Sequence, residues 1–224
     1  MSAPSNRRRL LQLAGAAAST LWLPRSAWSQ PRLADNPFAL GVASGSPTHD
    51  SVVLWTRLVQ AGLSGDSALG AAPVTVRWEI ADDEGFTRIV RSGQAQALAE
   101  LAHSVHVEVP GLASDRWYFY RFMAGEAVSP AGRTRTFPAP GAPASRLRLA
   151  YASCQRWEHG YYAAWRHLAA DEPDHVLFLG DYIYEYPGAA GAVRTHNDGW
   201  TLTLADYRRR YALLCLACAV LERA

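Results

Sequence analysis

Residues 175–181 are His175-Val176-Leu177-Phe178-Leu179-Gly180-Asp181, a continuous apolar run that stops at Gly-Asp. Such a run is typical of a strand buried on both faces, and the glycine marks the turn at its end. Upstream, a second strand is predicted over 147–152 and ends at Ser153-Cys154-Gln155, while 161–170 has helical spacing. The order strand, helix, strand predicts a βαβ unit with two parallel strands.

Cys154 and Asp181 directly follow the two predicted strands. Because the carboxyl ends of parallel strands meet at one edge of the sheet, where ligands of open α/β sheets bind, we expect these side chains to lie together. Tyr184 follows Asp181 by three residues. A carboxylate can bridge two cations, and thiolate and phenolate ligands suit a ferric ion. A capped turn also explains Gly-Asp, and an unpaired cysteine is commonly a small buried hydrophobe, but the convergence of all three favours a metal site.

Residues 36–138 have a different pattern from the βαβ unit. Short runs of alternating apolar and polar residues are separated by turn residues, over 38–42, 51–57, 74–80, 103–109, 117–122 and 133–137. This pattern predicts an antiparallel β-sandwich. Tyr118, six residues after Leu112, resembles the tyrosine corner of fibronectin type III domains, in which the phenol bonds to nearby backbone. The proline-rich segment 139–145 predicts an extended linker, and the α/β part is expected over 146–224.

The first 29 residues are typical of an export signal. Arg7, Arg8 and Arg9 precede a modestly apolar segment, and Ala27-Trp28-Ser29 supplies the small residues of a cleavage site near Gln30. Paired arginines favour the twin-arginine translocation machinery as a partner and a periplasmic or extracellular location. A basic amphipathic helix is the alternative interpretation of this segment.

Composition excludes several classes of protein. Apolar residues make up 49% and charged residues 19%, with eight Trp and ten Tyr, which is incompatible with a disordered or low-complexity chain. The net charge of +2 is too small to suggest nucleic-acid binding. Three cysteines cannot form a disulfide scaffold. No uninterrupted apolar stretch reaches about 20 residues, so no membrane span is expected in the mature chain.

Several blocks of the sequence resemble the alkaline phosphatase D (PhoD-like) family of secreted metallophosphoesterases. They are FALGVASGSP at 38–47 with VLWTR at 53–57, ASCQ at 152–155, LGDYIYE at 179–185, and TLADYRRRY at 203–211. The resemblance runs from about residue 36 to about residue 213. It implies a β + α/β chain in which a fibronectin III-like β-sandwich precedes the first βαβ part of a calcineurin-like metallophosphatase domain.

The resemblance also implies a chemistry. Members of the family hydrolyse phosphate monoesters and diesters with Fe³⁺ and Ca²⁺ as cofactors, so a phosphate ester is the implied substrate. By position, Cys154 and Tyr184 are the implied iron ligands, and Asp181 is the implied carboxylate between iron and calcium.

The sequence departs from the family pattern near its C-terminus. The later Asn, Asp and His ligands of the family have no counterpart here, and His196-Asn197-Asp198, with those residue types in another order, is interpreted as an ordinary polar loop. Cys215 and Cys218 form a C-x-x-C pair that could bind metal or act in redox chemistry, but 213–221 is better interpreted as an apolar, helix-like tail. A catalytic domain truncated in this way is expected to expose apolar surface around Val176, Phe178 and this tail, and to have little activity.

Two function classes therefore remain open. One is a secreted metal-dependent phosphoesterase, and the other is a non-catalytic secreted β-sandwich that acts as a binding module. The ligand blocks favour the enzyme, whereas the missing later ligands favour the binding module. The iron and calcium content of the purified mature chain would separate the two.

Overall fold

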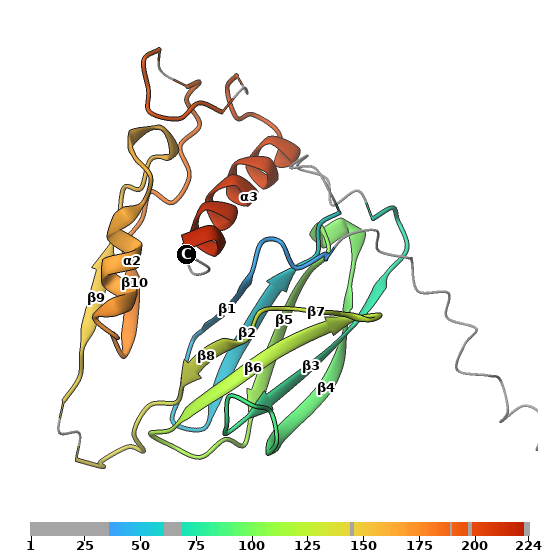
Figure 1. Ribbon diagram of the computed structural model, residues 1–224, viewed down its shortest axis with the longest axis vertical. Helices are drawn as coiled ribbons and strands as arrows, with labels where there is room; N and C mark the ends of the chain where they lie inside the picture. The colour runs from blue at the N-terminus through green and yellow to red at the C-terminus, as the bar shows by residue number, and fades with distance from the viewer. Residues whose placement is uncertain (1–35, 61–68, 144–145, 189, 197–198, 222–224) are drawn as a thin grey trace, which may run out of the picture. The chain divides into compact units, whose positions relative to one another are not determined.

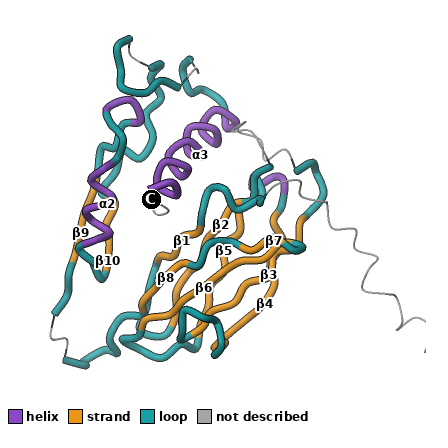
Figure 2. Tube along the Cα trace, viewed as in Figure 1, coloured by secondary structure: helices purple, strands orange, loops and turns teal. Residues whose placement is uncertain are grey.

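The computed structural model describes residues 36–60, 69–143, 146–188, 190–196 and 199–221, with side chains as far as Cys215. The predicted signal at 1–29, including Arg7, Arg8 and Arg9, lies outside the described residues. Figures 1 and 2 show strands first and helices later along the chain. In order, the elements are β1 (Val42–Gly45), β2 (Ser51–Arg57), β3 (Val74–Ala81), β4 (Ile89–Ala97), η2 (Ala99–Leu101), β5 (Ser104–Pro110), β6 (Trp117–Ala124), β7 (Ala127–Val128), β8 (Gly132–Arg135), β9 (Leu149–Ala152), η3 (Trp157–His159), α2 (Ala163–Ala170), β10 (His175–Phe178) and α3 (Leu204–Leu221).

The first eight strands form the predicted antiparallel β-sandwich. One sheet has the order β1-β2-β5, and the other has the order β4-β3-β6-β7, with β8 paired to β6. Alternate residues of both sheets point into a common core. Fully or almost fully buried members of that core are Val52, Leu54, Val74, Val76, Val105, Val109, Tyr118, Tyr120 and Phe122. The alternating pattern of the sequence is therefore the pattern of inward and outward side chains.

The first strand begins later than the sequence predicts. Residues 38–41 form a turn, closed by a 2.9 Å bond from the Gly41 amide to the Phe38 carbonyl, and β1 begins only at Val42. Gly41 has φ +77°, a conformation that glycine adopts without the steric cost of a side chain. Phe38 is nonetheless fully buried in the sandwich core. Phe38 is therefore part of the sandwich core although it lies in a turn and not in a strand.

Strand β4 was not predicted. Its sequence, IVRSGQAQA, lacks large alternating apolar residues, and most of its side chains are exposed. It lies at the end of its sheet, where it pairs only with β3 among the described strands. An edge strand buries little side-chain surface, so hydrophobic periodicity carries only a weak signal for it.

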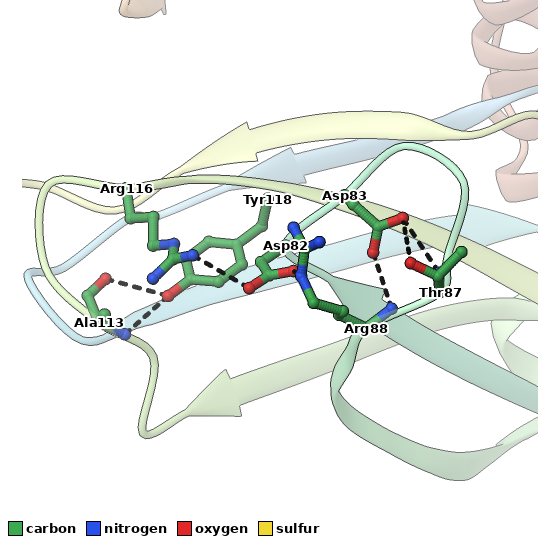
Figure 3. Close-up of polar contacts among 7 residues, drawn as sticks. All are labelled: Asp82, Asp83, Thr87, Arg88, Ala113, Arg116 and Tyr118. Carbon is green, nitrogen blue, oxygen red and sulfur yellow. Dashed lines mark hydrogen bonds and ion pairs between the residues drawn. The ribbon is translucent and has the colours of Figure 1, made fainter.

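The tyrosine corner is confirmed. The phenol oxygen of Tyr118 accepts a 2.8 Å hydrogen bond from the Ala113 amide, as Figure 3 shows. Tyr118 is 2% exposed, so its ring fills the core while its hydroxyl holds the loop before β6. The nearby Arg116 donates to Asp82 at the end of β3 at 3.0 Å, which ties this loop to the β3–β4 turn.

The βαβ unit is also as predicted. Strands β9 and β10 are parallel, with Leu149 paired to His175 and Ala152 paired to Phe178. The helix begins at Ala163, two residues later than expected, because Tyr162 has a left-handed backbone with φ +58°. Trp165 of α2 stacks on Phe178 at 6.1 Å between ring centroids, so the helix covers that face of the two strands.

Apolar side chains are exposed on the other face of this small sheet. Tyr151 is 74% exposed and Leu177 is 41% exposed, and the two are paired in register. Val176 is exposed as expected, whereas Phe178 is only half-buried against α2. Two-stranded sheets of this kind are marginally stable by themselves.

Helix α3 begins with a capping box. The Asp206 amide donates to the Thr203 hydroxyl at 3.2 Å, and the Thr203 amide donates back to the Asp206 carboxylate at 2.8 Å. This reciprocal pair satisfies donors that the first turn of a helix otherwise leaves without partners. Among the described residues, no helix is both long enough and apolar enough to span a membrane.

The expectation that the apolar tail is exposed is wrong for its described side chains. Leu214 is 2% exposed and Cys215 is 8% exposed. Together with Ala212, Cys215 packs against Leu40 and Val59 of the sandwich part. The side chain of Cys218 lies outside the described residues. The helical backbone over this segment, by contrast, is as predicted.

Candidate metal centre

The ends of β9 and β10 bring the predicted ligands together. The Leu179 amide donates to the Ala152 carbonyl at 2.8 Å, and the Cys154 amide donates to the Gly180 carbonyl at 3.2 Å. These two bonds continue the pairing of the strands beyond their last residues. The parallel topology therefore places Cys154 beside the turn that carries Asp181, as the sequence predicts.

The backbone is strained at both positions. Cys154 has φ +56° and Asp181 has φ +52°, which are left-handed conformations that residues with a side chain rarely adopt. Gly180, with φ +131°, permits the turn between β10 and Asp181. Strain of this kind gathers at functional sites, where surrounding structure maintains it. Both side chains leave their strands through these turns and are exposed.

The three predicted ligands meet at one carboxylate oxygen. The Cys154 thiol lies 3.6 Å from Oδ2 of Asp181, and the Tyr184 hydroxyl donates to the same oxygen at 3.1 Å. A thiol, a phenol and a carboxylate thus converge from two loops that are far apart in sequence.

The contacts of Tyr184 change its acidity. Burial and hydrogen bonds with Cys154 and Asp181 raise its pKa from 10.0 to about 12. Loss of water around the phenol disfavours the phenolate most, and the phenolate would also lie beside two other groups that can carry negative charge. A cation placed among the three donors would reverse this effect, because it favours the ionised form of each donor. The donor set therefore fits a cation, and its sulfur and phenol oxygen fit a ferric ion.

The phenol of Tyr184 is the third donor of the candidate metal site. Among the described residues, no three His, Cys, Asp or Glu side chains are grouped so that they could hold a metal ion. At Asp181, only a thiol and a carboxylate belong to those four types, and the third group is the Tyr184 phenol.

A buried hydrogen bond between a histidine and a glutamate lies near this site, and the sequence did not predict it. Nε2 of His196 is 2.5 Å from Oε1 of Glu158, and the two side chains are 0% and 3% exposed. His196 lies in a loop, as predicted, but its side chain is buried, which the sequence did not indicate, while Asn197 and Asp198 lie outside the described residues. Burial alone would raise the pKa of Glu158, but its hydrogen bonds, including the one from His196, lower it below the ordinary value.

Arg156 connects the buried pair to the metal loop, which we define as residues 180–186. Its Nε donates to Glu158 at 3.3 Å, and its guanidinium lies 5.8 Å from the centre of the Tyr184 ring. Arg194 holds the same region by donating to the Trp157 carbonyl at 3.1 Å. Polar residues in loops follow no periodic pattern. The sequence therefore shows that Arg156 and Arg194 are present but does not predict which groups they bond to.

Comparisons with known proteins agree with this architecture. Residues 24–138 match the N-terminal domain of PhoD-like phosphatases, and residues 149–218 match the PhoD-like phosphatase domain itself. Alkaline phosphatase D of Bacillus subtilis (strain 168) is 51% identical over 187 residues, which are 81% of this chain and 32% of that protein.

A solved structure of PhoD superposes with a TM-score of 0.80 at 49% identity. The match covers 84% of this chain and 38% of that one, so the chain spans about a third of the length of these relatives. The two domain matches together extend over most of the sequence. The chain belongs to the PhoD-like phosphatase family.

Proposed function

We propose that residues 146–221 carry the first ligands of the metal centre of a secreted phosphoesterase that hydrolyses phosphate monoesters and diesters. The observation that carries the proposal is the convergence of Cys154, Asp181 and Tyr184 at a single oxygen atom. Cys154 and Tyr184 would bind Fe³⁺, and Asp181 would bridge it to Ca²⁺. Family membership supports a phosphate ester as substrate.

Each residue of the site has a distinct part in this chemistry. Bound metal ions supply Lewis acidity toward a phosphoryl oxygen and make water a better nucleophile. Asp181 would hold both cations, because a carboxylate offers two oxygen atoms as ligands. Cys154 acts as a ligand and forms no covalent phosphoenzyme. Tyr184 would bind the cation as a phenolate, a form that its raised pKa disfavours when no cation is present.

The scaffold of the site favours weak metal binding by this 224-residue chain. The ligands sit on turns after a two-stranded sheet, one face of which exposes Tyr151 and Leu177. A two-stranded sheet is only marginally stable by itself, so β9 and β10 support the ligand turns weakly. We infer that the chain has little phosphoesterase activity by itself. Export by the twin-arginine pathway to the periplasm or the extracellular space belongs to the same proposal.

Iron content tests the ligand assignment. The purified chain is titrated with Fe³⁺ in the presence of Ca²⁺, and bound metal is measured after gel filtration. Cys154→Ser and Tyr184→Phe should each lose iron, whereas the matched variants Cys215→Ala and Tyr186→Phe should retain it. Equal iron in all five proteins would refute the assignment.

Activity is measured in parallel, with an aryl phosphate and a bis-aryl phosphodiester as substrates. We expect slow hydrolysis at most, and any metal-dependent hydrolysis should disappear in Asp181→Ala. Turnover at about 1–1,000 per second, the usual range for enzymes, would contradict the inferred weakness of the site.

A further inference from the structure

Helix α3 contacts the metal loop through one face. Arg210 donates through Nη1 to the carbonyl of Tyr184 at 2.8 Å and to the carbonyl of Tyr186 at 3.2 Å. One turn earlier, the Tyr207 hydroxyl donates to Glu185 at 3.1 Å. The spacing of these positions, with Tyr211 and Leu214 beyond them, is that of a single helix face. The backbone on both sides of Glu185 is therefore held by one side chain of α3.

Arg210 is unusual because it is charged and yet only 3% exposed. Burying a guanidinium is costly unless hydrogen bonds compensate for the water that it loses. Two of these bonds go to backbone carbonyls of a segment without helix or strand structure, where such carbonyls would otherwise bond to water. Arginine suits this task because its donors are fixed in a plane, so one side chain can serve two acceptors.

The same helix is anchored to the β-sandwich. Arg57, at the end of β2 and 2% exposed, donates to the carbonyl of Arg208 at 3.1 Å. Arg208 in turn donates to the carbonyl of Glu100 at 2.5 Å. Trp55 of β2 meets the Tyr211 ring edge-on at 6.1 Å. The helix is thus fixed on one side to rigid strands and on the other to the metal loop.

Aromatic rings complete the connection. Tyr211 lies 5.3 Å from the Tyr182 ring, and Tyr182 lies 4.9 Å from the Phe178 ring at the end of β10. The contacts therefore run without a break from Trp55 in the sandwich to the strand that precedes Asp181.

We propose that Arg210 is a positioning residue for the metal centre. In this proposal α3, which is held in place by the β-sandwich, restricts the movement of the metal loop. This inference rests on the proposed function, because it takes Tyr184 to be a metal ligand. By fixing the Tyr184 carbonyl, Arg210 limits where the phenol can lie relative to Asp181 and Cys154. The loop then meets the cation in a shape that is already close to the bound one, so less conformational freedom is lost on binding.

The test compares Fe³⁺ binding by the full chain with that of three variants. Arg210→Met keeps the length of the side chain and removes its donors. Arg210→Lys keeps the charge and enough reach for one carbonyl. Arg209→Met is the matched control, because Arg209 bonds to Asp206 of its own helix. Affinity is followed by titration, and the geometry at Tyr184 by the visible charge-transfer absorption of a ferric phenolate.

We expect Arg210→Met to bind Fe³⁺ about 10- to 100-fold more weakly, the usual effect of removing a residue that orients a metal ligand. Its phenolate absorption should also change in position or intensity, which a general loss of stability would not produce. Arg210→Lys should be intermediate and Arg209→Met unchanged. If Arg210→Met fails to unfold cooperatively, Arg210→Lys decides alone, and weaker binding by that variant supports the proposal.

Two outcomes would overturn the inference, and they are distinguishable. If the unmodified chain binds Fe³⁺ through Tyr184 and the Arg210 variants bind it equally well with the same absorption, the positioning role is wrong while the metal site stands. If the unmodified chain binds no more Fe³⁺ than Cys154→Ser and Tyr184→Phe, the proposed function fails, and the role of Arg210 fails with it.

Discussion

Nε2 of His196 lies 2.5 Å from Oε1 of Glu158, although 38 residues separate them in the sequence. Because a carboxylate can only accept, the imidazole nitrogen must donate the hydrogen bond. Both side chains are almost fully buried, and Arg156 is the second partner of the carboxylate. The bond fastens the loop around His196 to η3, close to the metal loop.

Removing the histidine should destabilise the α/β part. His196→Ala leaves Glu158 buried with one partner fewer, and we expect the free energy of unfolding to fall by about 2 kcal/mol, as for other hydrogen bonds to charged groups. Urea denaturation measures the change. His49→Ala is the matched control, because His49 is exposed and should alter stability by less than about 0.5 kcal/mol. Equal effects of the two substitutions would show that the buried bond contributes nothing.

Tyr118→Phe tests the tyrosine corner in the sandwich. The substitution keeps the buried ring and removes the acceptor of the Ala113 amide, so the free energy of unfolding should fall by about 1 kcal/mol. Tyr151→Phe removes a hydroxyl from a tyrosine that is 74% exposed and should be neutral. Thermal unfolding of both variants gives the comparison. A Tyr118→Phe protein as stable as the unmodified chain would contradict the role of this bond.

Helix α3 should be sensitive to acid. Hydrogen bonds from the Thr203 hydroxyl and from the Thr203 and Leu202 amides lower the pKa of Asp206 from 3.8 to about 2. A depressed carboxyl pKa means that the folded state favours the ionised form. The stabilisation is therefore present above about pH 4 and is lost as the pH falls from about 4 to about 2.

Circular dichroism over that range measures the effect. Helix content of the unmodified chain should decrease as Asp206 is protonated. In Asp206→Asn the helix should be weaker at neutral pH, and its acid-induced loss should be smaller. Glu84→Gln, which changes an exposed carboxylate outside the helix, should behave like the unmodified protein. Identical titrations for the Asp206 and Glu84 variants would refute this origin of the acid sensitivity.

Export is predicted to depend on the paired arginines. Replacing Arg7, Arg8 and Arg9 together by lysine should retain the precursor in the cytoplasm, because the twin-arginine machinery recognises arginine specifically. Arg25→Lys makes the same chemical change outside the motif and should leave export intact. Cell fractionation and N-terminal sequencing of the exported protein, with a start expected near Gln30, provide the measurements. Unimpeded secretion of the triple variant would exclude this route.

The sequence alone was enough for the parts of the fold that depend on local patterns. Alternation around Val52 and Val76 predicted the sandwich, because the two faces of a strand meet different surroundings. The apolar run at 175–179 and the helical spacing before it predicted the parallel βαβ unit. From that topology followed the approach of Cys154 to Asp181, since parallel strands end at one edge.

Only the tertiary structure decided the features that depend on partners distant in sequence. The burial of Cys215 required a sandwich surface to receive it, and the tail by itself looked exposed. His196 and Arg210 have polar neighbours in the sequence, yet both are buried. His196 is hydrogen-bonded to Glu158, and Arg210 is hydrogen-bonded to the Tyr184 carbonyl. A hydrophobic period reports which face of an element is buried, because each residue contributes to it independently. A buried polar contact depends on two positions at once, so its energy is defined only when the fold has brought both together.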